Sequence, residues 1–407
     1  MSRDATAPGD SGPRRGAVPR RDVRARAERF GAILATDEPP MLAWVDQDFA
    51  RSVGVPESPL WSEPPREVLS APTEVHMLAT RRCPLTCDHC YTDSSPEAGT
   101  DLDTAAFKAR LDALAELGVF HVALGGGEAF LRPDLLELAA HARAVGLTPN
   151  VTTSGFGLER FPAAEVAALF GQINLSVDRV RDDEPDLFGE DKTARARRVL
   201  DPLVAAGARV GFNVVLTRDN FAELGEIARF GVERGITDIE VLRFKPTGRG
   251  RDGYLARRLT PEQRLRLFPM VLEVSEATGL PIKLDCSSTP FVACHQPDPE
   301  RMARFDVVGC IGGVTLLGAD EQGRASACSF YPPESGDLLD PVGLWENPES
   351  FREFRDYPTA AREPCRSCPY LGLCRGGCRA VARFLTGDPL APDPECPAVR
   401  AANELEV

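Results

Sequence analysis

The twelve cysteines of this 407-residue chain are unevenly distributed, and that distribution constrains the fold and chemistry more than any other feature. Three lie between residues 83 and 90, none lies between 91 and 285, and nine lie between 286 and 396. About 3% cysteine is too sparse for a disulfide scaffold, which typically has roughly 8–10%. The N-terminus contains no apolar run of signal-peptide length. We therefore expect a cytoplasmic protein whose clustered thiols bind metal.

Composition excludes two classes of partner. The chain carries 61 acidic and 47 basic residues, a net charge of −14, so nucleic acid and anionic membranes are unfavourable partners. No segment approaches the roughly 18 consecutive apolar residues of a membrane-spanning helix. The length predicts a soluble, enzyme-sized protein of roughly two to three domains.

The pattern along the chain predicts four parts. Residues 1–27 are rich in Pro, Gly and Arg without hydrophobic periodicity, which predicts a disordered tail. Residues 28–72 contain apolar clusters sufficient for a strand and a short helix, a small appendage that could bind peptide. Residues 73–285 alternate strand and helix patterns, and residues 286–407 form a Cys-rich region with few large apolar side chains.

The alternating region predicts an α/β fold, a partial (βα)6 TIM-like barrel of parallel strands. Reactive groups in such a sheet lie at the carboxyl ends of the strands, so the loops after each strand are the places to examine. A seventh strand is possible over residues 280–285. The six expected strands are Val75–Thr80, Val119–Leu124, Pro149–Thr153, Gln172–Val177, Val210–Leu216 and Ile239–Phe244.

The loop after the first expected strand carries Cys83, Cys87 and Cys90 with the spacing C-x3-C-x2-C. Three thiolates can hold three irons of a cubane cluster and leave the fourth iron open to a cofactor or substrate. The alternative is a structural zinc site with His89 as the fourth ligand. After the next strand, three glycines that permit close backbone approach precede Glu128, a carboxylate able to bind an ammonium group.

The cysteine triplet, the following Gly-Gly-Glu and the βα units together resemble the radical S-adenosylmethionine (radical SAM) superfamily over residues 73–285. The resemblance implies that Cys83, Cys87 and Cys90 bind a [4Fe–4S] cluster, whose open iron is chelated by S-adenosylmethionine. It implies that S-adenosylmethionine yields a 5′-deoxyadenosyl radical that removes a hydrogen atom from the substrate.

The resemblance also implies residues that contact S-adenosylmethionine. Gly126, Gly127 and Glu128 would face its amino group, and His89 would lie near its adenine. Contacts to ribose and carboxylate are expected from later strand ends, with Arg243 as a replacement for an arginine that many relatives carry shortly after the fourth strand. The expected residues at these strand ends are Ser154, Ser176 and Asp178.

The C-terminal cysteines match the SPASM extension of radical SAM enzymes, which binds two auxiliary [4Fe–4S] clusters. The resemblance implies three [4Fe–4S] clusters in all. Two zinc knuckles are the alternative for this region. For the fourth ligand of the inner cluster, Cys286 is preferred over Cys294. The implied outer ligands are Cys365, Cys368, Cys374 and Cys396, and the implied inner ligands are Cys310, Cys328 and Cys378.

SPASM-type enzymes mostly act on peptides, so the resemblance implies a maturase that oxidises or crosslinks a ribosomally synthesised precursor peptide. An anaerobic sulfatase-maturating enzyme or a redox-cofactor peptide maturase is the alternative within the class, and an iron–sulfur electron carrier or zinc scaffold the alternative outside it. Expected partners are the peptide, a reductant such as flavodoxin or ferredoxin, and a separate leader-peptide recognition protein. No catalytic acid or base stands out, and His76, His121 and His141 are interpreted as packing residues.

Overall fold

A computed structural model describes residues 23–38, 40–180, 192–304, 307–333 and 336–405. The chain divides into two compact units, residues 1–64 and residues 65–407, and each is described by itself. Among the described residues, no helix is long and apolar enough to cross a membrane.

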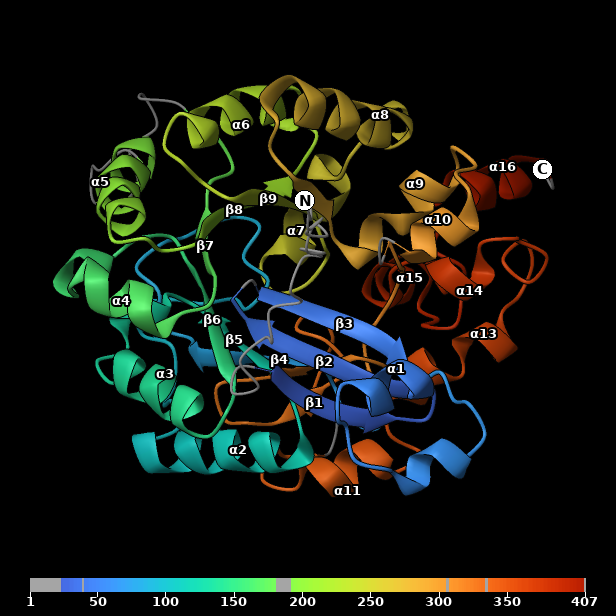
Figure 1. The fold of residues 1–407 in the computed structure, drawn as a ribbon. Helices are drawn as coiled ribbons and strands as arrows, with labels where there is room; N and C mark the ends of the chain where they lie inside the picture. The colour runs from blue at the N-terminus through green and yellow to red at the C-terminus, as the bar shows by residue number, and fades with distance from the viewer. Residues whose placement is uncertain (1–22, 39, 181–191, 305–306, 334–335, 406–407) are drawn as a thin grey trace, which may run out of the picture. The chain divides into compact units, whose positions relative to one another are not determined.

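The first unit is a three-stranded antiparallel sheet followed by a short helix (Figure 1). Ala32, Leu34 and Ala50 form its small core. Helix α1 starts at Asp46, whose carboxylate accepts a hydrogen bond of 2.8 Å from the Phe49 amide and so satisfies one of the open N–H groups. The elements are β1 (Val23–Glu28), β2 (Gly31–Asp37), β3 (Pro40–Asp46), α1 (Gln47–Ser52) and η1 (Pro59–Ser62).

Two boundaries differ from the sequence-based expectation. The expected tail reached residue 27, but β1 begins at Val23; residues 1–22 of that tail lie outside the described residues. The strand has the sequence VRARAE, in which apolar and charged residues alternate. Two of its three apolar residues are alanines, which favour strands only weakly, so the pattern did not indicate a strand. The expected appendage reached residue 72, but the Trp345 Nε1–H donates to the Leu69 carbonyl at 2.9 Å, and residues 65–72 belong to the second unit.

The second unit is built on a nine-stranded sheet with the order β10-β9-β8-β7-β6-β5-β4-β11-β12. The six expected parallel strands are confirmed, and the possible seventh is β10, parallel to β9. Their bounds are β4 (Glu74–Thr80), β5 (His121–Gly126), β6 (Thr148–Thr153), β7 (Ile173–Ser176), β8 (Val210–Leu216), β9 (Asp238–Arg243) and β10 (Ile282–Leu284).

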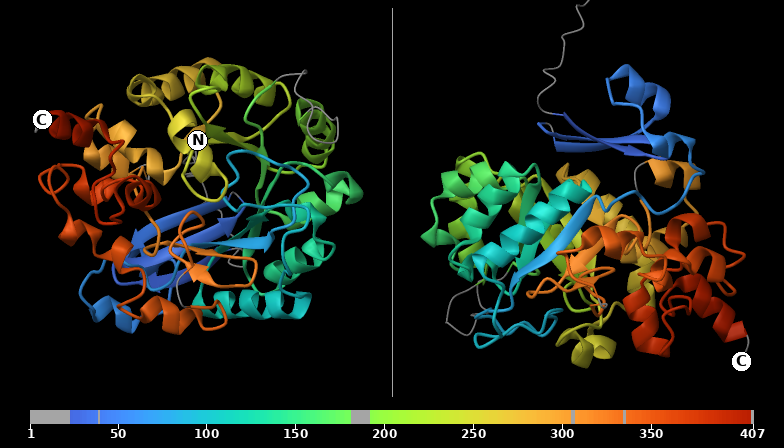
Figure 2. Two further views of the ribbon diagram at one scale, coloured as in Figure 1. Left: turned by 180° about the vertical axis from the view of Figure 1, so that it is seen from behind. Right: turned by 90° about the horizontal axis from the view of Figure 1, so that it is seen from below.

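Helices cover the outer face of this curved sheet (Figures 1 and 2). Apolar side chains of the helices and strands meet in one core, for example Leu111 and Ile227 with Val122 and Phe212. Helix α2 ends at Gly118, whose φ of 93° is a left-handed C-cap that glycine adopts without strain. The outer helices are α2 (Thr104–Leu117), α3 (Leu135–Ala144), α4 (Ala163–Leu169), α5 (Lys192–Ala205), α6 (Leu224–Val232) and α8 (Pro261–Thr278). The other helices of this region are α7 (Gly250–Arg257), η2 (Ala129–Leu131), η3 (Leu158–Arg160) and η4 (Phe221–Glu223).

The Cys-rich region shares its sheet with the barrel. Strand β11 (Leu316–Ala319) pairs in parallel with β4, and β12 (Ala325–Ser326) pairs with β11. The remaining structure of this region is short helices, so the predicted division at residue 286 does not separate two sheets. These helices are η5 (Cys286–Ser288), α9 (Thr289–Ala293), α10 (Pro299–Arg304), α11 (Pro341–Glu346), α12 (Arg352–Arg355), α13 (Tyr357–Ala360), α14 (Leu371–Cys374), α15 (Arg379–Thr386) and α16 (Pro397–Leu405).

Candidate functional site

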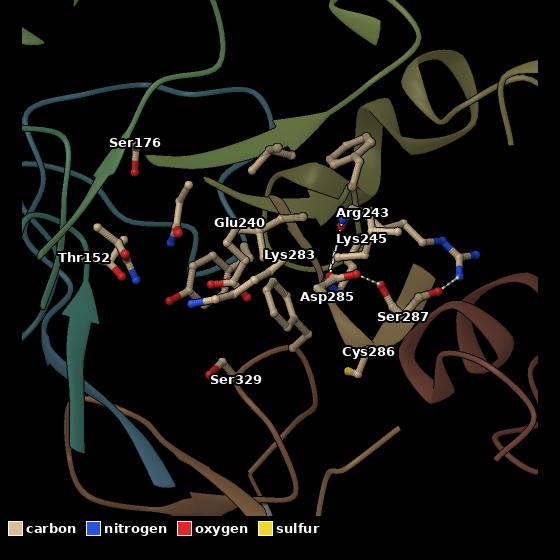
Figure 3. Close-up of a pocket in the computed structure, with 18 of the residues that line it drawn as sticks. Thr152, Ser176, Glu240, Arg243, Lys245, Lys283, Asp285, Cys286, Ser287 and Ser329 are labelled. Carbon is tan, nitrogen blue, oxygen red and sulfur yellow. Dashed lines mark hydrogen bonds and ion pairs between the residues drawn. The ribbon is translucent and has the colours of Figure 1, made fainter. Parts of the chain in front are cut away.

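A cavity of about 1690 Å³ lies within the second unit, inside the curve of the parallel sheet (Figure 3). Pockets for a single small molecule are typically about 300–1000 Å³, so this cavity has room for a cofactor and part of a second molecule. Strand β4 contributes Glu74, His76, Met77 and Leu78 to its wall, whereas Val75 and Ala79 are fully buried in the core. The cavity also collects seven cysteines: Cys83, Cys87, Cys90, Cys286, Cys310, Cys328 and Cys378.

The first three of these cysteines lie on the loop after β4, as predicted. Arg249 fastens this loop, donating to the Cys87 carbonyl at 3.2 Å and to the Ser94 carbonyl at 2.7 Å. Gly248 has a φ of 55°, and a Cβ there would approach the Cys90 carbonyl oxygen to 2.5 Å. Contacts with the segment that begins α7 therefore position the cysteine loop.

The sulfur atoms of this loop lie in one electrostatic environment. Burial is the main cause that raises the pKa of the Cys83 thiol to about 12; the Leu85 backbone lowers this pKa, and the charges of Glu128, Cys87 and Cys90 contribute to the rise. A thiolate would therefore be strongly disfavoured here without a cation to stabilise it, and a metal centre supplies that cation. The surroundings of the triplet fit a metal–thiolate site.

The glycines after β5 serve close packing. A Cβ on Gly126 would lie 2.2 Å from the Thr80 carbonyl oxygen, and one on Gly127 would lie 2.3 Å from that of Arg82. Both glycines line the cavity. They allow the loop after β5 to pack against the start of the cysteine loop, an approach that any larger residue would block.

Glu128 does not line the cavity, contrary to the expected contact with an ammonium group. Its side chain is fully buried, and its carboxylate accepts hydrogen bonds from Thr153 Oγ1 (2.7 Å), from the Ser154 amide (2.8 Å) and Oγ (2.6 Å), and from the Phe130 amide (3.1 Å). Burial raises the pKa of Glu128, while these hydrogen bonds lower it. In this arrangement Glu128 holds the end of β6 and orients Ser154.

The other expected cofactor contacts reach the cavity. Ser154, Ser176, Asp178 and His89 all line it, and Ser176 is exposed there. His89 Nε2 lies 3.2 Å from Asp178 Oδ2, while Asp178 Oδ1 accepts from the Val215 amide at 2.8 Å. The structure therefore brings two predicted contacts from different loops into one pair.

Arg243 has a different role from the one expected. Its guanidinium, only 4% exposed, donates to Asp393 at 2.6 and 3.1 Å, to Glu395 at 2.8 Å and to the Ser287 carbonyl at 2.9 Å. With two buried carboxylates already bound, Arg243 is not available to a cofactor carboxylate. It instead ties the end of β9 to the C-terminal cysteine region.

Sequence reasoning missed Arg195, one of several arginines that line the cavity. It lies on α5, is 1% exposed, and lines the cavity. Burial lowers its pKa, as does Arg198, while Glu128, Glu159 and Cys87 raise it. Arg195 lies 19 residues after Ser176, whereas the resemblance implied an arginine shortly after the fourth strand.

Four C-terminal cysteines form an inner group in the cavity wall. Burial raises the pKa of the Cys286 thiol, and Cys310 and Cys378 raise it further. Burial also raises the pKa of Cys328, and the same two cysteines, Cys310 and Cys378, add to that rise. Cys294 lies elsewhere: its thiol donates to the Phe291 carbonyl at 3.3 Å, and no other cysteine contributes to its shift. The structure thus brings Cys286, and not Cys294, to the inner group.

The remaining four cysteines form an outer group away from the cavity. Burial raises the pKa of Cys374, and Cys396 and Cys365 add to the rise. Burial also raises that of Cys365, with a contribution from Cys368. The predicted division into inner and outer ligands therefore corresponds to two spatial groups.

The donor sets fit clusters bound by thiolates. All twelve cysteines are free thiols. Within the part of the chain that the structure describes, no three Cys, His, Asp or Glu side chains converge on a point that one metal ion could occupy. Each thiolate of a cubane binds a different iron, so a cluster site does not require that convergence.

Charged side chains occupy the wall between the cysteine groups, and sequence reasoning missed them (Figure 3). Lys245 forms an ion pair with Asp285, and its Nζ lies 4.1 Å from the centre of the Phe330 ring. His76 was interpreted as a packing residue, but it lines the cavity; its Nε2 lies 3.6 Å from Glu74 Oε2 and its Nδ1 lies 3.1 Å from Ser329 Oγ. Alternation along β4 could have indicated that His76 faces the barrel interior.

Comparison with known sequences identifies the family. Residues 77–231 match the model of the radical SAM superfamily. The chain is 32% identical over 345 residues to the mycofactocin maturase MftC of Mycobacterium tuberculosis, covering 81% of this chain and 83% of the relative. It is 31% identical over 333 residues to the PqqA peptide cyclase of Methylocella silvestris, covering 78% and 85%.

Solved structures share the fold at lower identity. Streptococcus suis SuiB bound to S-adenosylmethionine superposes with a TM-score of 0.73 at 16% identity, over 93% of this chain and 99% of SuiB. The enzyme anSMEcpe with bound AdoMet and a peptide superposes with a TM-score of 0.58 at 16% identity, over 82% and 96%. Because a relative at least 30% identical spans four fifths of its length, the chain belongs to the radical SAM superfamily, whose enzymes use S-adenosylmethionine and a [4Fe–4S] cluster.

Proposed function

We propose that this enzyme is a maturase that oxidises or crosslinks residues of a ribosomally synthesised precursor peptide. The observation that carries the proposal is that one cavity holds both the Cys83–Cys90 loop and the inner cysteine group, with more room than a cofactor needs. The names of the relatives support it, since MftC is a maturase and PqqA peptide cyclase acts on a peptide.

In this proposal Cys83, Cys87 and Cys90 hold the cluster that binds S-adenosylmethionine. When bound, these two groups supply a radical that removes a hydrogen atom from the substrate. The pair His89–Asp178 and the hydroxyls of Ser154 and Ser176 form the wall around the cofactor, and the backbone of Gly126 and Gly127 lies beside its amino group. The buried guanidinium of Arg195 is assigned to bind the carboxylate of S-adenosylmethionine.

The inner and outer cysteine groups are proposed to hold two auxiliary [4Fe–4S] clusters. The inner ligands are Cys286, Cys310, Cys328 and Cys378, and the outer ligands are Cys365, Cys368, Cys374 and Cys396. Support comes from the two spatial groups of four thiols, each sufficient to occupy every iron of a cubane. The inner group lines the cavity, so its cluster would lie close to the peptide.

The first unit is proposed to bind the peptide outside the cavity. Strand β3 is an edge strand, and its side chains Met41 and Trp44 are 48% and 45% exposed. Phe49 of α1 is 51% exposed. An edge strand with exposed apolar side chains can accept an extended peptide as a further strand. The proposed partners are a reductant such as flavodoxin or ferredoxin and a separate leader-peptide recognition protein. The proposed location is the cytoplasm.

The test is anaerobic purification followed by incubation with S-adenosylmethionine, dithionite and the precursor peptide encoded beside the gene. We expect about twelve irons per chain, as three [4Fe–4S] clusters require, release of 5′-deoxyadenosine, and a change in the peptide mass. A colourless protein that contains zinc, or modification that persists without S-adenosylmethionine, contradicts the proposal.

A further inference from the structure

Glu240 of β9 lines the cavity, and its side chain makes no hydrogen bond or ion pair within the described part of the chain. Figure 3 shows its side chain among those that line the pocket, near Lys283, its neighbour on β10. Burial raises the pKa of this carboxyl group, and the charges of Asp285 and Glu74 raise it further, while His76 and Lys283 lower it.

The neighbouring acids of this wall have partners. Asp285 is bound by Lys245, and Glu74 lies 3.6 Å from His76. Lys283, the remaining cation near Glu240, lies 3.5 Å from Asp238. An unpaired carboxylate in a partly buried position destabilises the folded protein, so a purely structural role does not explain Glu240.

We propose that Glu240 receives a positively charged Lys or Arg side chain of the peptide that enters the cavity; this inference rests on the proposed function. A cation at this position would be attracted by Glu240 and an anion repelled by it, whereas the charges of Asp285 and Glu74 are offset by Lys245 and His76. A charge-assisted hydrogen bond to a carboxylate is about twice as strong as one between neutral groups.

The position also suits a role in placing the peptide. Glu240 precedes Val241, whose carbonyl accepts from the Asp285 amide at 3.1 Å, and Asp285 is followed by Cys286 of the inner group. Glu240 and the inner group therefore share one wall of the cavity. A basic side chain held at Glu240 fixes which neighbouring residue of the peptide lies between the inner group and the Cys83–Cys90 loop.

The first test needs no substrate. We expect Glu240→Gln to raise the midpoint of thermal unfolding at pH 8 by a few degrees, because the neutral amide removes an unpaired charge. Glu74→Gln, the matched change at a carboxylate that has a partner, should lower the midpoint at pH 6, where His76 carries its charge. If Glu240→Gln lowers the midpoint as Glu74→Gln does, Glu240 has a structural partner and the proposal is wrong.

The second test measures binding without turnover. The probe is the precursor peptide encoded beside the gene, labelled with fluorescein, in its natural form and with each Lys or Arg replaced by Gln; anisotropy is recorded without S-adenosylmethionine. We expect one such replacement and Glu240→Gln each to weaken binding about tenfold, and their combination to weaken it no further. Glu165→Gln, at an exposed position of α4, serves as the control.

Additive effects in this cycle, or a modified segment that contains no Lys or Arg, would overturn the anchor while leaving the proposed function intact. Failure of the proposed function is separate, because it would appear as wild-type protein that releases no 5′-deoxyadenosine and modifies no peptide.

Discussion

His89 Nε2 lies 3.2 Å from Asp178 Oδ2, although the two residues belong to loops after different strands, β4 and β7. Asp178 is itself held in place: its Oδ1 accepts from the Val215 amide, and its carbonyl accepts from Asn220 Nδ2 at 2.9 Å. The carboxylate therefore connects β8 to the imidazole next to Cys90. It fixes one side of the cavity wall relative to the cysteine loop.

Asp178→Asn should weaken binding of S-adenosylmethionine about fivefold, because a partly exposed ion pair contributes up to about 1 kcal/mol. The amide oxygen can still accept from Val215, so the loop keeps its backbone contact while His89 loses its charged partner. Isothermal titration calorimetry under anaerobic conditions measures the dissociation constant.

The control for this prediction is Asp88→Asn. Asp88 is on the same cysteine loop, but its side chain is 79% exposed and pairs with Arg257 at 2.9 Å. We expect the dissociation constant of S-adenosylmethionine for Asp88→Asn to stay within a factor of two of the wild-type value, since exposed ion pairs contribute little. Equal effects of the two substitutions would show that His89–Asp178 has no special role.

Cys286 and Cys294 provide a matched pair for the auxiliary clusters. Cys286→Ser should lower the iron content by up to about four per chain, because it removes a ligand of a four-iron cluster. Cys294→Ser should leave the iron content and the electron paramagnetic resonance spectrum unchanged, because its thiol is bound to the Phe291 carbonyl. Loss of iron in Cys294→Ser but not in Cys286→Ser would reverse the assignment.

The barrel was largely predictable because its signals are local. Strands and helices of the βα units differ in hydrophobic period, and glycines such as Gly118 mark where a helix ends. Strand β11 was not predictable in this way. It is four residues long, lies in a segment rich in Cys and Gly, and becomes a strand because it pairs with the free edge of β4.

The site was predictable where a spacing encodes chemistry and not where charges meet across the fold. The spacing of Cys83, Cys87 and Cys90 identified the triplet, since it lies on one loop. The partners of Arg243 come from residues 393 and 395, about 150 positions away, and no local pattern connects them. The same holds for Glu240: that its side chain has no partner among the described residues is a property of the folded cavity.

The Arg243–Asp393 pair should be a major stabilising contact between the barrel and the C-terminal region. Asp393 also accepts from the Cys378 amide at 3.0 Å and lies three residues before Cys396. Asp393→Asn leaves Arg243 with Glu395 as its remaining carboxylate partner and removes one charged, buried hydrogen-bond acceptor, so it should destabilise the protein by about 1–3 kcal/mol. The measurements are the thermal unfolding midpoint and the iron content, both of which should fall.

Glu273→Gln is the control for that substitution. Glu273 pairs with Arg266 at 2.7 Å, but both side chains are more than half exposed. We expect a change within about 0.5 kcal/mol and no loss of iron, as for other surface positions. A similar loss of stability in both variants would mean that burial does not distinguish the two ion pairs.

The Glu74–His76 pair should make stability depend on pH. Burial opposes the charge on both groups, but the close contact with His76 and its charge lower the pKa of Glu74 to about 2, and the contact with Glu74 and its charge raise the pKa of His76. The contribution of Glu74 is therefore present above pH 4.5 and lost as the pH falls towards 2. The contribution of His76 is present below its usual pKa of 6.5 and lost as the pH rises through the higher value of the folded state.

The pair should thus stabilise the protein most between about pH 4.5 and 6.5. Both side chains are about one third exposed to the cavity, so the effect should stay below about 1 kcal/mol. Unfolding midpoints of wild type and Glu74→Gln, recorded from pH 5.5 to 9, should differ most at the acid end and converge as His76 loses its proton. A difference that is constant with pH would show that Glu74 acts through packing and not through its charge.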